Sequence, residues 1–517
     1  MSEARGRVFL VGAGPGAPDL ITMRGAAVLG RAEVVVYDYL VSAEILRLAP
    51  GGARRIYVGK KGGGARVAEQ PEINRRLIEE ARAGRIVVRL KGGDPFIFGR
   101  GGEECEALAA AGIEYEVVPG ISSAIAAPAF AGIPLTHRER GSFVIFVTGH
   151  QEAANDSAGG IPWEDLARAA RGRGTIVILM ATARMRENLA RLATGGLGPA
   201  TPAAAIQWGT TAAQRSVIAT VATLADEAAR AAIGSPAVIV VGECAALGAE
   251  LRWAERLPLF GRRIVVTRAG GGAAEFAARL RAEGAEAIEF PVIATAPPTS
   301  YEVLDRAIAE RGAFDWIIFT SAVGVASFFD RMRATGHDLR EIGAAAIAAI
   351  GPATAARVAE YALTVAAVPA EYRAEALIGA LGPERIAGAR ILIPRAEVAR
   401  EILPELLIAH GAREVIVAPA YRTIPAAGGA DADRIRALAA AGAIDLVTFT
   451  SSSTVTNYCA SAGAPPVGLK AAAIGPITAA TARAHGFTVV AEPAHYTVAA
   501  LADEIVRYFA GMPDAPA

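Results

Sequence analysis

A predicted buried strand runs into a charged, glycine-rich loop in the stretch Arg89-Leu-Lys-Gly-Gly-Asp-Pro-Phe-Ile-Phe-Gly-Arg-Gly-Gly-Glu-Glu104. A helical pattern comes before that strand, with an apolar face of Ile73, Leu77, Ile78 and Ala81, and ends at Gly84. Helix, strand and loop following one another in this way are typical of α/β proteins. The stretch therefore predicts an α/β fold.

Lysine is almost absent from the chain, whose lysines are Lys60, Lys61, Lys91 and Lys470. Three of these four lie in glycine-rich loops that follow predicted strands. The pKa of an ammonium group moves on burial, whereas a guanidinium stays protonated. The retained lysines therefore favour a chemical role, although a loop lysine is most often a solvated side chain.

The length of 517 residues predicts about three or four folding units. No charge-free run approaches the roughly 20 residues that a bilayer crossing requires, and the N-terminus has no apolar signal core. We expect a cytoplasmic protein without a membrane segment. Formal net charge is zero, so the global field does not favour nucleic acid. Cys105, Cys244 and Cys459 are too few and too far apart for a disulfide framework or a metal site.

Apolar runs typical of strands alternate with helical patterns in the first half of the chain. They are Val8–Val11, Val34–Tyr37, Ile86–Leu90, Val144–Val147, Thr175–Met180 and Val238–Val241. The segment Glu250–Arg263 interrupts this pattern, and a fresh strand starts at Ile264. We place the main domain boundary there.

The second half repeats itself at a period of roughly 125 to 130 residues. The echoes pair Ile264–Ala269 with Ile391–Ala396, Asp315–Ser321 with Asp445–Ser451, and Ile350–Ala355 with Ile474–Ala479. Three echoes in one order predict two similar α/β lobes with a ligand site between them. Hydroxyls and N–H groups at the helix starts of these motifs can bind carboxylates or simply cap the helices.

The first strand ends in the glycine turn Val11-Gly-Ala-Gly-Pro-Gly16, which lets a ligand approach the backbone closely. The turn lacks dinucleotide spacing, and Pro15 removes a donor that a pyrophosphate would use, so a small cofactor without pyrophosphate fits better. Asp38 ends the strand Val34–Tyr37. Its carboxylate can take a proton from a substrate or cap the next helix.

Further charged side chains follow other predicted strands. Lys60 and Lys61 would place two ammonium groups at the same rim as Asp38. A second group consists of Arg89, Lys91, Asp94, Arg100, Glu103 and Glu104. This group either orients a charged cofactor or substrate carboxylates, or forms a local ion-pair network. His137 and His150 lie on loops, where a structural or a catalytic role is open.

The first half, Val8 to about Trp253, closely resembles the uroporphyrinogen-III C-methyltransferases of the tetrapyrrole methylase superfamily, which include the methyltransferase module of siroheme synthase. The matching motifs are Val11–Gly16, Val36–Asp38 with Leu40–Ser42, Val58–Lys60, Val88–Glu104, Val118–Ile121, Gly132–Arg138 and Val147–His150. The resemblance implies a two-lobed fold, a homodimer through this half, and S-adenosylmethionine bound between the lobes as methyl donor, with no metal.

By motif position, the resemblance places the contacts with S-adenosylmethionine on Pro15, Gly92, Gly93, Asp94, Ile97, Ser122, Ser123, Met180 and Gly209. Ser122-Ser123 departs from the Thr-Ala common at that place, and Thr182 stands near where a glycine often follows Met180. Asp38 would be the proton acceptor and Lys60 the proton donor. These roles agree with the chemistry, because a pyrrole carbon that takes a methyl group must lose a proton to a nearby base.

The second half, Pro258 to about Gly511, resembles uroporphyrinogen-III synthase. The matching motifs are Val266–Ala269, Phe319–Ser321, Ile350–Ala355, Ile393–Arg395 with Leu403-Pro404, Tyr421–Thr423, Phe449–Ser452 and Ile474–Ala479. The resemblance implies closure of linear hydroxymethylbilane with inversion of ring D and loss of water. Tyr421 matches a family tyrosine near a hinge between lobes, where it either assists hydroxyl loss or packs the hinge.

The two resemblances together predict a bifunctional enzyme that makes uroporphyrinogen III and methylates it twice to precorrin-2, towards siroheme or cobalamin. We expect a methyltransferase domain at 1–253 with lobes of about 1–120 and 121–253, a linker at 254–261, and a synthase domain at 262–517. Lobe one of the synthase would comprise about 262–291 plus 421–511, and lobe two about 292–420. Two alternatives stay open: a C-terminal half that only binds tetrapyrrole and regulates, or a methyltransferase for a later corrin intermediate. The partners would be tetrapyrroles, without nucleic acid or membrane.

Overall fold

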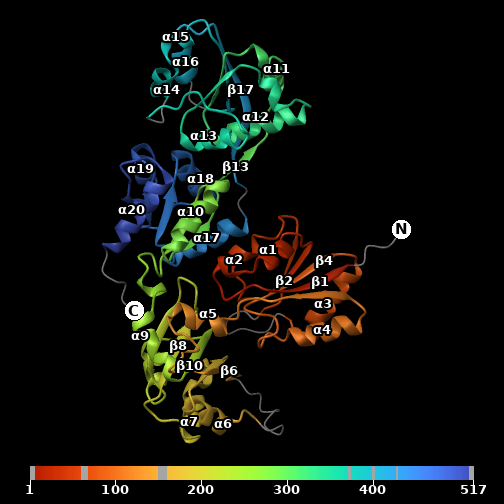
Figure 1. Ribbon diagram of the computed structural model, residues 1–517, viewed down its shortest axis with the longest axis vertical. Coiled ribbons are helices and arrows are strands. Elements are labelled where there is room, and N and C mark those ends of the chain that lie inside the picture. The colour runs from red at the N-terminus through yellow and green to blue at the C-terminus, as the bar shows by residue number, and fades with distance from the viewer. Residues whose placement is uncertain are drawn as a thin grey trace. The chain divides into compact units, whose positions relative to one another are not determined.

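The computed structural model describes residues 6–59, 68–149, 160–370, 374–398, 402–426 and 429–511 (Figure 1). They form four five-stranded sheets connected by helices. The chain divides into two compact units, one of Met1–Phe290, Arg434–Val455 and Ala464–Ala517, the other of Pro291–Asp433 and Thr456–Gly463. Within the described ranges, no helix has the length and apolar character needed to cross a membrane.

The first sheet is parallel throughout, in the order β3-β2-β4-β1-β5. Its strands are β1 (Arg7–Gly12), β2 (Val34–Tyr37), β3 (Arg54–Tyr57), β4 (Ile86–Lys91) and β5 (Glu114–Val118). Helices α1 (Met23–Leu29) and α2 (Ala43–Leu46) pack on one face, and α3 (Gln70–Arg82) and α4 (Gly101–Ala110) on the other. Burial of both faces explains why these strands read as continuous apolar runs.

Residues of β4 alternate between the two faces of this sheet, because successive side chains of a strand point to opposite sides. Val88 and Leu90 join the core beneath α1 and α2. Val87 joins the core beneath α3 and α4, and Arg89 and Lys91 share its face. The central strand thus places two cations under α3 and α4.

The second sheet has the order β6-β7-β10-β8-β9 and is parallel only between β6 and β7. Its strands are β6 (Phe143–Thr148), β7 (Gly174–Leu179), β8 (Pro202–Gln207), β9 (Arg215–Thr220) and β10 (Ala237–Val241). One face packs against α6 (Trp163–Arg171), α7 (Met185–Thr194) and α8 (Leu224–Arg230), and the other against α5 (Ser123–Phe130). Helix α9 (Gly248–Leu251) and a short 3-10 turn, Ala254–Arg256, then lead to β11 (Arg263–Val266).

The third sheet is parallel, in the order β12-β11-β18-β19-β20. Its strands are β11 (Arg263–Val266), β12 (Glu286–Glu289), β18 (Leu446–Phe449), β19 (Lys470–Ala473) and β20 (Thr488–Ala491). The helices between and after them are α10 (Gly271–Ala282), α17 (Ala430–Ala440), α18 (Ser452–Ala462), α19 (Pro476–Ala484) and α20 (Val498–Ala510).

The fourth sheet has the order β13-β17-β16-β14-β15 and is parallel except for the pair β13 and β17. Its strands are β13 (Ile293–Ala296), β14 (Trp316–Phe319), β15 (Ala346–Ala349), β16 (Arg390–Ala396) and β17 (Glu414–Pro425). Its helices are α11 (Glu302–Ala309), α12 (Ala322–Ala334), α13 (Pro352–Ala359), α14 (Ala374–Leu381), α15 (Pro383–Ile386) and α16 (Ile402–Ala409).

The predicted duplication is confirmed by strand order, because β12-β11-β18-β19 in the third sheet corresponds to β17-β16-β14-β15 in the fourth. The polar contacts at the strand starts repeat as well. Asp445 accepts from the backbone N–H of Arg263 at 2.8 Å, and Asp315 accepts from that of Arg390 at 2.7 Å. Arg263 pairs with Glu286 as Arg390 pairs with Glu414.

The six runs predicted as strands are confirmed, each to within one residue at either end. The predicted helix is α3, whose buried residues include Ile73, Leu77 and Ala81. Lys91 differs from expectation, since it is the last residue of β4 rather than a loop residue, and it is only 4% exposed. The domain and lobe limits given above stay predictions.

Candidate active sites

Three glycine-containing loops meet where β1, β4 and β5 of the first sheet end. Gly14 and Gly93 exchange two backbone hydrogen bonds, with N···O distances of 3.1 and 2.7 Å. A methyl group on Gly12 would lie 2.5 Å from the Cα of Gly120, and one on Gly120 would lie 2.3 Å from the carbonyl oxygen of Gly93. Only glycine allows this backbone-to-backbone packing, so the edge is lined by main chain rather than by side chains.

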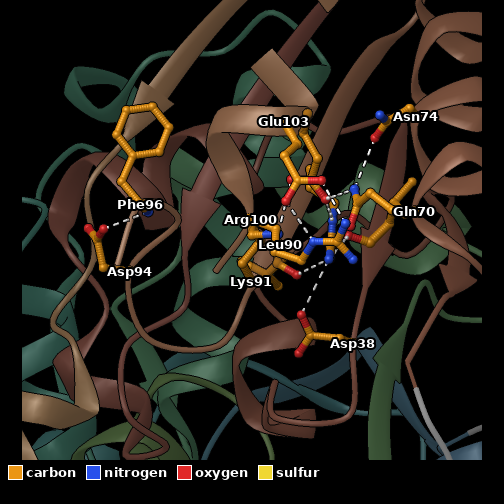
Figure 2. Close-up of polar contacts among 12 residues, drawn as sticks. Asp38, Gln70, Asn74, Leu90, Lys91, Asp94, Phe96, Arg100 and Glu103 are labelled. Carbon is orange, nitrogen blue, oxygen red and sulfur yellow. Dashed lines mark hydrogen bonds and ion pairs between the residues drawn. The ribbon is translucent and has the colours of Figure 1, made fainter. Parts of the chain in front are cut away.

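Asp94 ties two of these loops together. Its Oδ1 accepts from the backbone N–H groups of Phe96 at 2.8 Å and Ile97 at 3.2 Å, as Figure 2 shows for Phe96. Its Oδ2 accepts from the N–H of Gly120 at 3.0 Å. The carboxylate therefore fixes the loop Gly92–Ile97 against the end of β5, while the Ile97 side chain stays 40% exposed.

The start of α5 adjoins the same glycines. Ser122 caps α5 by accepting from the N–H of Ala124 at 3.2 Å. A methyl group on Gly93 would lie 3.8 Å from the Cα of Ser122 and from the nitrogen of Ser123. The structure thus brings together five predicted contact residues, Gly92, Gly93, Asp94, Ser122 and Ser123.

The glycine turn after β1 adjoins the turn that contains Gly209. Thr210 Oγ1 accepts from the N–H of Ala17 at 3.2 Å, and a methyl group on Gly16 would lie 2.7 Å from a side-chain carbon of Thr211. Pro15 directly precedes Gly16, and Gly209 directly precedes Thr210. Each of these two predicted residues is therefore a chain neighbour of the contact between the two turns. Met180 directly follows β7, with φ +54° and a side chain 54% exposed.

Asp38 follows β2 and is joined to a buried charge network. Its Oδ2 lies 3.5 Å from Nη2 of Arg89, and its Oδ1 accepts from the N–H of Leu40 at 3.2 Å. Arg89 Nε donates to Glu104 Oε1 at 3.0 Å, and Lys91 Nζ lies 3.0 Å from Glu104 Oε2. Figure 2 shows Asp38 at one end of this network and Lys91 within it.

Burial and charge act in opposite directions within the network. Burial opposes ionisation of Glu104, but the charges of Arg89 and Lys91 hold the pKa of that carboxyl below its usual value. Burial, with the neighbouring Arg89, lowers the pKa of the Lys91 ammonium, against the opposing pull of Glu104. Neither side chain is exposed enough to reach a ligand, since Lys91 and Glu104 expose 5% and 0% of their side chains. The structure therefore shows Arg89, Lys91 and Glu104 in an ion-pair network.

The remaining charged residues of the motif lie at the surface. Arg100 pairs with Glu103 at 2.6 Å, and about half of each side chain is exposed. Near Asp38, the pKa of Tyr39 and that of Tyr57 are raised. Burial is the larger cause, and the negative charge of Asp38 is the second.

Several predicted positions lie outside the described residues, namely Lys60, Lys61 and His150. His137 is described, and its Nδ1 accepts from the N–H of Glu139 at 3.2 Å, a structural role within its loop. Among the described residues, no group of three or more His, Cys, Asp or Glu side chains is placed to hold a metal ion.

Tyr421 lies in β17 of the fourth sheet, opposite Ala396 at a register shift. Its hydroxyl is 3.0 Å from Oγ of Ser321, which also caps α12 by accepting from the N–H of Gly324 at 3.0 Å. Tyr421 and Arg331 line a cavity of about 350 Å³ within this unit. Sequence reasoning missed the partnership of Ser321 and Tyr421, because 100 residues separate them.

The repeated position in the third sheet has a different partner. Ser451 corresponds to Ser321, and its Oγ lies 2.9 Å from the Oγ of Ser453 on the next helix. Ser451 Oγ also accepts from the N–H of Thr454 at 3.3 Å, as Ser321 Oγ accepts from that of Gly324, so the cap is shared and only the second hydroxyl partner differs.

Comparison with known proteins matches the two halves of the chain to two different families. Residues 7–225 match the family of tetrapyrrole (corrin/porphyrin) methylases, and residues 274–503 match uroporphyrinogen-III synthase HemD. The porphyrin biosynthesis protein HemD of Ruminiclostridium josui is 37% identical over 510 residues, which cover 98% of this chain and 99% of that protein. The chain belongs to this HemD family. Both predicted family resemblances are thereby confirmed.

Proteins similar to the first half alone include members of the methylase family. An S-adenosyl-L-methionine-dependent uroporphyrinogen III methyltransferase of Methanosarcina barkeri is 48% identical over 243 residues, covering 47% of this chain and 93% of that protein. A solved structure, the uroporphyrin III C-methyltransferase of Thermus thermophilus, is 38% identical and covers 47% of this chain and 100% of its own, with a TM-score of 0.40. In this family member, a methylase domain therefore precedes a synthase domain.

Proposed function

We propose that the second half of this chain closes hydroxymethylbilane to uroporphyrinogen III and that the first half methylates this product twice, to precorrin-2. Membership of the HemD family and the methylase match support a place in tetrapyrrole biosynthesis for both halves. Precorrin-2 would then serve the formation of siroheme or cobalamin.

The proposal for the first half rests chiefly on one observation, the meeting of three glycine loops beside Asp38. A methyl group on Gly92 would lie 2.5 Å from Cβ of Leu40, so the loop after β4 touches the segment that carries Asp38. Such a main-chain surface suits a cosubstrate that must approach the backbone closely. We therefore assign S-adenosylmethionine to Pro15, Gly92, Gly93, Asp94, Ile97, Ser122, Ser123, Met180 and Gly209.

S-adenosylmethionine supplies an electrophilic methyl group. The residues of this chain bind the two reactants and remove a proton: once the new carbon–carbon bond has formed, the Asp38 carboxylate accepts the proton that the ring carbon loses. Asp38 is partly exposed, at 21% of its side chain, which leaves it accessible for this transfer. Lys60, outside the described residues, is assigned as the proton donor.

In the second half we assign Tyr421 to the loss of the hydroxyl group from hydroxymethylbilane. The phenol would donate its proton to the departing hydroxyl, which leaves as water, before the ring closes with ring D inverted. The bond to Ser321 supports this role, because it fixes the direction of the phenolic oxygen.

The decisive experiment supplies the purified intact chain with hydroxymethylbilane, first without and then with S-adenosylmethionine. We expect the type III isomer in the first reaction and precorrin-2 in the second. Formation of the spontaneous type I ring alone would leave the second half as a tetrapyrrole-binding regulatory module. Type III product without methylation, together with activity on a later corrin, would identify a different methyl acceptor.

A homodimer through the methyltransferase half and a cytoplasmic location stay predictions. Analytical ultracentrifugation of the intact chain tests the first, and fractionation of the producing cell tests the second.

A further inference from the structure

The charges around β4 balance only when Asp38 is counted. Arg89, Lys91 and Glu104 are buried together, with 5%, 5% and 0% of their side chains exposed. Two cations and one carboxylate leave a surplus of one positive charge in a region of low dielectric, which is costly unless it is compensated. Asp38, at the edge of the same network, supplies the fourth charge and makes the cluster neutral.

Arg89 connects the buried part of the cluster to Asp38. The hydrogen bonds of its guanidinium restrict the orientation of that group. Nε donates to Glu104, and Nη1 donates to the carbonyl oxygens of Leu90 at 3.0 Å and Val36 at 3.4 Å. Only Nη2 is directed to Asp38. A planar guanidinium held at several nitrogens has one orientation, so the position of Nη2 is set by the buried contacts.

Glu104 is fixed in turn from α3 and β4. Its Oε1 accepts from Gln70 Nε2 at 3.3 Å as well as from Arg89, and its Oε2 faces Lys91. Gln70 also donates to Asn74 Oδ1 at 2.9 Å, a contact visible in Figure 2. The chain of contacts from Asn74 through Glu104 to Arg89 therefore ends at one oxygen of Asp38.

We infer that Arg89, held by Glu104, is a positioning residue that orients the Asp38 carboxylate for proton transfer. Leu40 N–H binds one carboxylate oxygen and Arg89 the other, so the rotation of the group is restricted while its outer lone pairs stay accessible. This inference rests on the proposed role of Asp38 as the base. It assigns Arg89 no contact with substrate.

A double-mutant cycle in the intact chain tests the inference, using Arg89→Met, Asp38→Asn and the combination. Arg89→Met leaves Lys91 and Glu104 as a neutral buried pair, and the carboxylate that loses its cation, Asp38, lies at the partly exposed edge of the cluster. We expect Arg89→Met to lower kcat of methylation by about 10²-fold, with KM for S-adenosylmethionine changed less than about twofold. In the Asp38→Asn background we expect less than about a threefold further loss, because Arg89 acts through Asp38.

Additive losses in the cycle, with Asp38→Asn itself strongly impaired, would overturn the inference and leave the base assignment standing. Full turnover by Asp38→Asn would instead overturn the base assignment, and the inference with it. Binding of S-adenosylmethionine by calorimetry and type III isomer formation by the other half show whether each variant is folded.

Two further variants separate positioning from simple charge compensation. Arg89→Lys keeps the cation but loses the fork that joins Glu104 to Asp38, so we expect methylation to stay impaired. Restoration of full kcat by Arg89→Lys would overturn the inference. Arg76→Met is the matched control, since Arg76 makes a surface ion pair with Glu72 on α3, and we expect its kinetics to be unchanged.

Discussion

Asp38 and Tyr421, the two described residues to which we assign proton transfer, are held in different ways. Asp38 ends a network of buried charges in which Arg89 and Glu104 are almost fully enclosed. Tyr421 is held by one neutral hydrogen bond to Ser321, whose other function is to cap α12. Removing one partner from a buried ion pair is far more costly than removing a neutral hydrogen bond.

The chemistry explains the difference. A carboxylate acts as a proton acceptor in its charged form, and in this site the carboxylates of Asp38 and Glu104 offset the two cations Arg89 and Lys91. A phenol that donates a proton is neutral, so it needs orientation but no counter-charge. The first site therefore contains balanced positive and negative charges, whereas the second needs only a hydroxyl partner that orients the phenol.

The largest effect should come from Glu104→Gln, which removes the buried carboxylate from the charge network that ends at Asp38. Arg89 and Lys91 would stay buried without their shared carboxylate, so we expect the free energy of unfolding of this lobe to fall by about 3–5 kcal/mol. Hydrogen exchange of the β4 and α4 amides measures this loss. Glu103→Gln is the matched control: its pair with Arg100 is exposed, and we expect less than about 1 kcal/mol. Equal effects of both variants would show that the network is not a stability element.

The second prediction concerns Tyr421, which is held by a neutral hydrogen bond to Ser321. Tyr421→Phe removes only the hydroxyl, and we expect type III isomer formation to slow by about 10²-fold while methylation of supplied uroporphyrinogen III is unchanged. The control is Tyr361→Phe, because Tyr361 packs on Phe329 in the same core with ring centroids 4.4 Å apart. Retention of the wild-type rate by Tyr421→Phe would make Tyr421 a packing residue.

Ser321→Ala sharpens the comparison with a smaller change. The variant loses the cap of α12, worth about 1 kcal/mol, and frees the phenol of Tyr421, so we expect a several-fold fall in synthase kcat. Thr497→Ala is the matched control, since Thr497 caps α20, a helix of the same 13-residue length, by the same bond to the third residue. We expect that variant to lose the cap energy but keep synthase activity. Identical synthase kinetics of the two variants would show that Ser321 has no role in catalysis.

The smallest expected effect is a pH dependence of stability. The folded-state pKa of Glu104 is below its usual value of 4.5, so between these values the unfolded chain binds more protons than the folded one. The stabilisation by Glu104 is therefore complete above about pH 4.5 and is lost as pH falls through the folded pKa. Urea unfolding of this lobe between pH 6 and 3 should show a shallower decline for Glu104→Gln than for the wild type. Parallel curves would contradict the assigned charge state.

Much of the fold follows from local sequence patterns. The strand Val34–Tyr37 and the helix with Ile73 and Leu77 appear where periodicity predicts them, because strand and helix periods are properties of a short segment. The duplicated order of the C-terminal lobes likewise follows from echoed motifs.

The candidate sites were only partly predictable. The glycine motifs indicated main-chain lining, and Asp38 was placed correctly at a strand end. The sequence left Lys91 and Glu104 open between ligand binding and ion pairing, since nothing in the motif says which residues face the interior.

The amino-acid sequence by itself determined the α/β elements, the glycine turns, the internal repeat and the family. Only the tertiary structure decided that Glu104 lies beneath β4 with Arg89 and Lys91, that Arg89 reaches Asp38, and that Ser321 holds Tyr421. The reason is physical: periodicity acts within a few residues, whereas these contacts join residues 13 to 100 positions apart and depend on strand order and side-chain direction.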